Sequence, residues 1–453
     1  MLSSVCFILR GIFPPHLPTR VSIHCDARPQ HIRQRLSAFA ECPALLRNIS
    51  EIEVETWSPV ADPRGPLYLN FRAAQAISAF LRIVPHMPQL HTAGFSQIKV
   101  KQEYLALLFQ SNTLRHLKLI QCGLPKSVRL PPSPIRCLTL SLRDGCKLVE
   151  PLLGHCGANL EALDFTGHLP QPLGPTTRPL FPKLRKLRFF LKPGSIHHLD
   201  TLISLSPQLE HLEVDGFAYF LSRLSALPAS LNRLSIGRWM INDGALGTRR
   251  FVRLPHLHIT HLHITHYHHL AQGDHKGSVI PVIQRTFPNI TSLDLDIKWN
   301  FRNLALLLAR HLPNVARLKL AISSWSSTRG SDISPYHPYF AGPGGPLASL
   351  HLFVRCASKH DMDAYKIWVI DTLLGPDPGL GGPYLQEVKM VFDNSTRSVV
   401  QRTTRKGGCL QSEERKEDRM FWVYSHGNVS EGPCVEDWDS LGDWGSLGDW
   451  DHI

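Results

Sequence analysis

The sequence predicts an α/β fold: a leucine-rich-repeat solenoid with a curved parallel β-sheet on its concave face and helices on its convex face. Three observations predict it. Leucine is the commonest residue, with 66 copies among 453 residues. The pattern L-x-x-L-x-L recurs eleven times in one register, mostly at spacings typical of leucine-rich repeats. Between the copies lie segments with apolar residues three and four positions apart, as amphipathic helices require.

Each copy of the pattern predicts one short strand. The last two apolar positions are two residues apart, so they share one face of a strand, and the first begins the turn into it. The intervals between copies are 21, 25, 24, 25, 22, 28, 31, 25, 32 and 38 residues. The copies begin at Leu114, Ile135, Leu160, Leu184, Leu209, Leu231, Ile259, Ile290, Val315, Leu347 and Leu385, with weaker copies at Ile49 and around Leu90.

Five segments between the copies predict helices. A proline follows several of them, as at Pro207, Pro288 and Pro313, where it ends the helix and leads the chain toward the next strand. One strand and one helix cannot bury their own apolar faces, whereas stacked neighbours can, so the units form a single array. The helical segments are residues 71–84, 101–110, 196–205, 301–311 and 362–374.

The array has boundaries and insertions. Residues 31–392 are predicted to form the solenoid, with inserted Gly/Pro-rich loops at about 322–346 and 375–383. Residues 1–30 are expected to be an F-box remnant or an N-terminal cap. Residues 393–453 are charged and lack the repeat, so a disordered C-terminal tail is expected there.

Composition restricts the function classes. No run of apolar residues approaches the length of a transmembrane helix. The ten cysteines form no C-x-x-C pair, which favours reduced thiols in the cytosol or nucleus. The net charge is +12, but residues 430–453 contain seven Asp or Glu and no Lys or Arg, so residues 1–429 carry +19. A basic body with an acidic tail is consistent with an anionic partner or an interaction tail, but an ordinary solvated face with a disordered end is the favoured interpretation.

The repeats, with S/F/L-P-x-L leading into many of them, resemble those of fungal F-box/leucine-rich-repeat proteins. The segment VCFILRGIFPPHLPTRVSIH, from Val5 to His24, looks like the end of an F-box and its exit. The next segment, His31 to Glu55, looks like the first helix-plus-strand unit. The opening L-P-x-E-I/L-x-x-I of that module is absent. The resemblance implies a non-catalytic chain that recruits a protein substrate to a cullin-type ubiquitin ligase, and that contacts a Skp-type adaptor only if an F-box lies upstream.

The candidate binding residues lie between the last two apolar positions of each copy, because those side chains point to the concave face. They are Lys118, Thr139, Asp164, Arg188, Glu213, Ser235, His263, Asp294, Lys319, His351 and Lys389. Four are basic, three acidic and four uncharged. A mixed row favours a protein partner. A phosphate backbone would favour a mainly basic row, which makes a nucleic-acid or anionic-surface binder the second hypothesis.

No catalytic residue, metal site or cofactor is predicted. Seven histidines lie between His256 and His269, and His261 and His263 share a strand face where they could hold Zn²⁺. No Cys, Asp or Glu within that run completes a site, so a duplicated strand with exposed imidazoles is the favoured interpretation. Phosphate-binding loops and the common hydrolase motifs are absent from the sequence.

Overall fold

Two compact units make up the computed structural model, Met1–Leu209 and Glu210–Ile453, and each is described by itself. The residues that the structure describes are 19–24, 30, 34, 36–37, 41, 46–55, 71–124, 133–141, 149–166, 181–190, 196–217, 227–240, 258–268, 283–284, 286–297, 312–322, 347–355, 387–393, 397–406 and 409–418. Within these residues no helix is long and apolar enough to cross a membrane.

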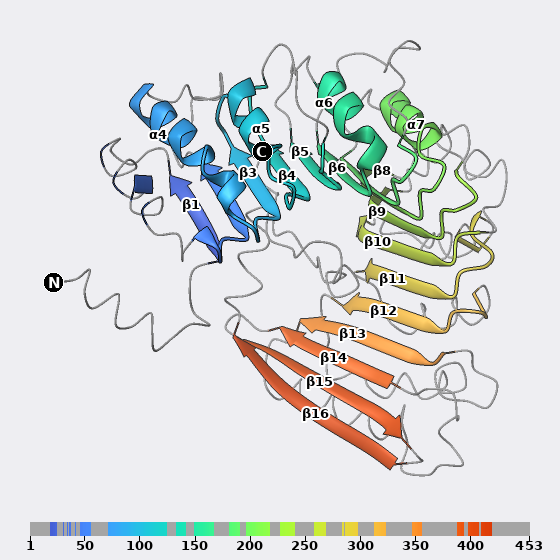
Figure 1. Ribbon diagram of the computed structural model, residues 1–453. Helices are drawn as coiled ribbons and strands as arrows, with labels where there is room; N and C mark the ends of the chain where they lie inside the picture. The colour runs from blue at the N-terminus through green and yellow to red at the C-terminus, as the bar shows by residue number, and fades with distance from the viewer. Residues whose placement is uncertain are drawn as a thin grey trace. The chain divides into compact units, whose positions relative to one another are not determined.

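The first unit is a parallel sheet flanked by helices on one side (Figure 1). Every strand pairs in parallel with the next one along the chain. The strands are β1 (Arg20–His24), β2 (Glu51–Glu55), β3 (Thr92–Ser96), β4 (His116–Ile120), β5 (Cys137–Ser141), β6 (Ala162–Thr166) and β7 (Lys186–Phe190). The helices are α4 (Phe71–Leu81), α5 (Gln102–Leu108), α6 (Val149–Cys156) and α7 (Ile196–Ser204), with short 3-10 turns η2 (Val84–His86) and η3 (Gly157–Asn159).

The repeat leucines form the core of this unit. Leu117, Leu138, Leu163 and Leu187 are aligned across four neighbouring strands, and each is at most 1% exposed. Two residues further on, Phe165 and Phe189 stack with ring centroids 5.5 Å apart. The first leucine of each copy is also buried, as at Leu114 and Leu160. All three apolar positions of L-x-x-L-x-L therefore serve one continuous core, as the repeat predicts.

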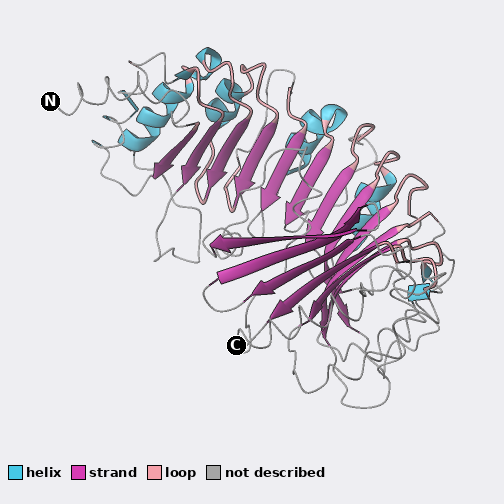
Figure 2. Cartoon of the chain, turned by 90° about the horizontal axis from the view of Figure 1, so that it is seen from below, coloured by secondary structure: helices cyan, strands magenta, loops and turns pink. Residues whose placement is uncertain are grey.

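The helices cover the leucine side of the sheet. In α5 the side chains of Tyr104, Leu105 and Leu108 are buried, and the Tyr104 ring stacks on Phe95 of β3 at 6.0 Å. Phe95 occupies the same register position as Leu119 of β4. The cartoon in Figure 2 shows the same arrangement, with the helices of this unit on one side of the strands. The opposite side of the sheet, which carries the residues between the leucines, is called the open face below.

The second unit continues the same pairing pattern. Its parallel strands are β8 (His211–Phe217), β9 (Arg233–Met240), β10 (His261–His268), β11 (Ser292–Ile297), β12 (Arg317–Ile322), β13 (Ser349–Arg355) and β14 (Glu387–Asp393). Leu212, Leu234, Leu262 and Leu293 are aligned in register and at most 2% exposed. The fold of the chain is therefore an α/β leucine-rich-repeat solenoid built from stacked strand units.

Two irregularities interrupt the register among the described strands of this unit. Between β10 and β11 the pairing shifts after Ile264. Between β8 and β9 it shifts after Val214, and Asp215 lies close to Gly237. A Cβ atom at Gly237 would lie 2.8 Å from Cα of Asp215, which no side chain tolerates without movement of the backbone. Glycine at this position therefore permits the bulge.

The predicted helices at 71–84, 101–110 and 196–205 are confirmed as α4 with η2, α5 and α7. Helix α6 was not among the predictions, because VEPLLGHC contains both a proline and a glycine. Pro151 lies in the first turn, where its missing N–H costs no hydrogen bond within the helix. The predicted helices at 301–311 and 362–374 and the loop at 375–383 lie outside the described residues. So does the loop predicted at about 322–346, except Ile322, which ends β12.

The structure differs from the expectation of a disordered tail directly after Phe392. Strands β15 (Arg397–Lys406) and β16 (Cys409–Asp418) follow β14 and pair antiparallel, the first with β14 and the second with β15. Within the β15–β16 pair, Arg402 stands at the register position of Glu413, and Arg397 at that of Asp418. Residues 419–453 lie outside the described residues.

At the other end of the chain, residues 1–18 of the F-box-like segment also lie outside the described residues. The end of that segment, Arg20–His24, forms β1, which pairs in parallel with β2.

Candidate functional site

The predicted binding residues form an aligned row on the open face of each unit, called the middle row below. In the first unit Lys118, Thr139, Asp164 and Arg188 are register partners on successive strands. In the second unit the row runs from Glu213 through Ser235, His263, Asp294, Lys319 and His351 to the register position of Lys389. Lys118 is buried and the other described side chains of the row are half-buried.

Opposite charges pair along the middle row. Arg188 Nη1 lies 3.9 Å from Asp164 Oδ2. In the second unit Asp294 Oδ2 lies 3.4 Å from Lys319 Nζ and 3.6 Å from His263 Nε2. These side chains are between 19% and 25% exposed, so each pair contributes little to stability and is accessible to a competing charge. A partner with complementary charges could form ion pairs with these side chains in place of the contacts within the row.

The amino-terminal strands carry a tighter ionic cluster than sequence reasoning predicted. Lys118 Nζ lies 3.0 Å from Glu51 Oε1 and 3.7 Å from Glu53 Oε1, although strand β3 separates β4 from β2. Arg20 of β1 forms an ion pair with Glu53 from the other side. The side chains of Lys118 and Glu53 are only 6% and 11% exposed. On this part of the open face, the charged side chains therefore already form ion pairs with one another.

Gly94 of β3 explains how Lys118 reaches across a strand. It stands in the middle row between Glu53 and Lys118. A Cβ atom there would approach Glu53 Cγ to 3.3 Å and Lys118 Cβ to 3.6 Å, so the absent side chain leaves the room through which the two charges meet. The alternation in Ile49-Ser-Glu-Ile52-Glu-Val54 could have identified Glu53 as a row member. No sequence signal indicated the contact across Gly94.

The candidate metal pair does not assemble a metal site with its described neighbours. His261 and His263 lie two residues apart in β10, so they share a strand face. The His261 ring contacts the Thr260 hydroxyl at 2.8 Å, and His263 faces Asp294. Within the described part of the chain, no group of three His, Cys, Asp or Glu residues could hold a metal ion. Nearby, burial lowers the pKa of His258.

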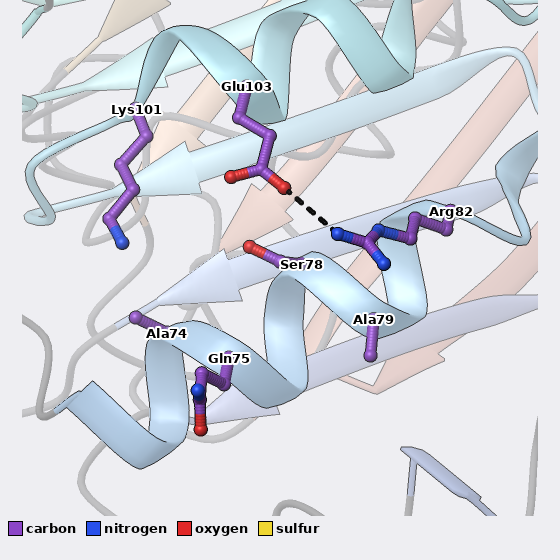
Figure 3. Close-up of a pocket in the computed structure, with 7 residues that line it drawn as sticks. All are labelled: Ala74, Gln75, Ser78, Ala79, Arg82, Lys101 and Glu103. Atoms are coloured by element: carbon purple, nitrogen blue, oxygen red, sulfur yellow. Dashed lines mark ion pairs between the residues drawn. The ribbon is translucent and has the colours of Figure 1, made fainter.

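A shallow hollow lies on the helix side of the first unit, between α4 and α5 (Figure 3). Its only charged pair in the figure joins Arg82 and Glu103, 3.6 Å apart and both well exposed. The lining residues are Ala74, Gln75, Ser78, Ala79, Arg82, Lys101 and Glu103.

Three of the described cysteines lie in the core of the first unit. Cys122, Cys137 and Cys156 are buried and form no disulfide bond with one another. Burial raises the pKa of the Cys156 thiol to about 11, and the Ser133 hydroxyl, which donates to Sγ at 3.4 Å, opposes this only in part. The reactive thiolate is therefore scarce at neutral pH, and the site is inert.

We expect Cys156 to resist alkylation in the folded protein. A short pulse of iodoacetamide at pH 8, followed by mass spectrometry of the tryptic peptides, should leave Cys156 unmodified. The same pulse in concentrated urea should modify it, because unfolding removes the burial that raises its pKa. Equal rates of modification with and without urea would contradict the buried position.

Comparison with known proteins adds little beyond this geometry. No family model matches the chain, and no curated protein matches it. Among the solved structures, the chain is similar to the crystal structure of the APL1 leucine-rich repeat domain. The two are 14% identical over 72% of this chain and 73% of that chain, with a TM-score of 0.25. The assignment of the fold therefore depends on the strand register and buried leucines described above.

Proposed function

We propose that the chain is a protein-recognition scaffold that binds a partner protein on the middle row of the open face. The observation that carries the proposal is the alignment of polar side chains at successive register positions over a buried leucine core. Such a row presents many weak polar contacts at fixed spacing, which suits a protein partner. Its mixed charges favour specificity over indiscriminate binding of anions.

A finer form of the proposal is that the chain recruits a protein substrate to a cullin-type ubiquitin ligase. The support is the resemblance of the repeats, and of Val5 to His24, to fungal F-box/leucine-rich-repeat proteins. In this form the middle row binds the substrate, and a Skp-type adaptor binds only if an F-box lies upstream of Met1. The chain would act in the cytoplasm or nucleus, and without catalytic residues of its own.

Affinity capture tests the ligase form. The tagged chain, and a version extended by any upstream coding sequence, are each recovered from cells and analysed by mass spectrometry. Recovery of a Skp-type adaptor and a cullin with the extended chain, and their loss when the extension is removed, is the expected result. If partner proteins are recovered without adaptor or cullin from both versions, the ligase role is wrong and the scaffold role remains.

An alternative is a repeat protein that binds nucleic acid or another anionic surface. Its support is the charge of +19 carried by residues 1–429. Binding to generic RNA or DNA should then weaken steeply as salt rises, because each neutralised phosphate releases counterions. An affinity that does not change between low and high salt, or no binding at low salt, would exclude this alternative.

A further inference from the structure

The open face of the second unit is rich in histidine. His263 and His351 occupy the middle row on β10 and β13. His211 lies two residues before Glu213 in β8, and His261 lies two residues before His263 in β10, so both lie on the same face as the middle row. Both align with Arg233 of β9. All four side chains are half-buried. Histidine ordinarily gains its proton near pH 6.5, so this face can change its charge under mildly acidic conditions.

The other charged groups on this face cancel one another. Among the described side chains of β8–β13 that share the face, three are acidic and three are basic: Glu213, Asp215, Asp294, Arg233, Arg317 and Lys319. The next strand, β14, places Glu387 and Lys389 at the corresponding register positions, one of each sign. The described face is therefore neutral while the four histidines are neutral, and reaches +4 when all are protonated.

The contacts of Asp294 show that basic side chains outnumber acidic ones at this point of the middle row. Its carboxylate lies between His263 Nε2 at 3.6 Å and Lys319 Nζ at 3.4 Å. Two basic side chains therefore share one carboxylate.

The chain itself contains an acidic segment that fits this face. Residues 430–453 hold seven Asp or Glu and no Lys or Arg, within which S-L-G-D-W occurs twice. These carboxylates stay ionised at pH 5.5, because their ordinary pKa values are near 4. Acidic groups and protonated histidines therefore coexist between about pH 4.5 and 6.

The acidic segment can reach the face. Eleven residues separate Asp418, the end of β16, from Ser430, and they span up to about 36 Å when extended. Neighbouring strands lie about 4.8 Å apart, so β13 is about 14 Å from β16 and β10 about 29 Å. A tethered segment also has a high effective concentration, which favours it over free acidic proteins.

We propose that residues 430–453 dock on the open face of β8–β13 when His211, His261, His263 and His351 are protonated. Docking covers the middle row of this unit in mild acid and releases it at neutral pH. The acidic segment is then a competitor of any partner that uses the same row.

Photo-crosslinking in the full chain tests this contact. Benzoyl-phenylalanine incorporated in place of Trp444 is activated at pH 5.5 and at pH 7.5, and crosslinked peptides are identified by mass spectrometry. Intramolecular crosslinks to peptides of β8–β13 are expected at pH 5.5, with yields falling at least about fivefold at pH 7.5 as the histidines lose their protons. They should also fall in high salt.

Three variants test whether the histidines and the acidic residues cause the crosslinks. Replacing the four histidines with glutamine should abolish the crosslinks at both pH values, whereas His116→Gln, on the open face of the first unit, should leave the pH dependence unchanged. Replacing the seven acidic residues of 430–453 with Asn or Gln, which leaves the folded strands untouched, should also abolish them. Crosslinks of equal yield at both pH values, crosslinks elsewhere, or their persistence in the neutralised tail would overturn the proposal. No partner enters the experiment, so such a failure leaves the recognition role standing.

Discussion

Replacing Leu187 with alanine is expected to lower the free energy of unfolding of the unit that contains β1–β7 by about 3 kcal/mol. Leu187 is 1% exposed and aligned with Leu163 on β6, so its removal leaves a cavity in the shared core. Neighbouring side chains on both the strands and the helices would lose packing contacts. The measurement is urea denaturation followed by far-ultraviolet circular dichroism.

The next residue provides the control. Arg188 points to the open face, is 25% exposed and pairs with Asp164 at 3.9 Å. Arg188→Ala should therefore change the free energy of unfolding by less than about 1 kcal/mol. If the two variants lose similar amounts of stability, the alternation of core and open face along β7 is wrong.

Replacing Lys118 with alanine is expected to cost about 2 kcal/mol, below the range of about 3–5 kcal/mol for breaking a fully buried ion pair. Among the described residues, the substitution leaves Arg20 as the cation that pairs with Glu51 and Glu53. Glu51 is 20% exposed, so water offsets part of the cost. The loss should be visible as a shift of the urea midpoint of the first unit.

Two further variants separate charge from packing at Lys118. Lys118→Ala combined with Glu53→Gln should lose less stability than the sum of the single changes, because the uncompensated carboxylate is removed. Lys319→Ala is the matched control in the same row, since Lys319 is 25% exposed and also faces a carboxylate. It should cost less than about 1 kcal/mol. A cost at Lys118 no larger than that at Lys319 would refute the buried cluster.

The strand units could be predicted because their information is local. An L-x-L triplet fixes which two side chains are buried and which one points away, whatever its neighbours do. Repetition then fixes the register, since a slip by one residue would turn Leu138 or Leu163 out of the core. The middle row follows from that alternation alone, which is why Thr139 and Asp164 stand as register partners where the pattern places them.

The contacts that sequence could not predict involve residues far apart in the chain. Lys118 and Glu51 are 67 positions apart, and they meet only because Gly94 on the intervening strand lacks a side chain. The antiparallel pair β15 and β16 was missed because these strands lack the L-x-x-L-x-L pattern and are rich in charged residues. Helix α6 was missed because local propensity argued against it, while its Leu152 and Leu153 are buried in the core.

The most direct test of the recognition role compares two arginine reversals. Arg188→Glu changes the middle row, whereas Arg82→Glu makes the same change of charge on the helix side, where Arg82 also pairs with a carboxylate, that of Glu103. The measurement is the affinity of each purified variant for a partner captured with the unmodified chain. Recognition by the middle row predicts a loss of at least about tenfold for Arg188→Glu and less than about twofold for Arg82→Glu. Equal affinities for the two variants, or a larger loss for Arg82→Glu, would contradict it.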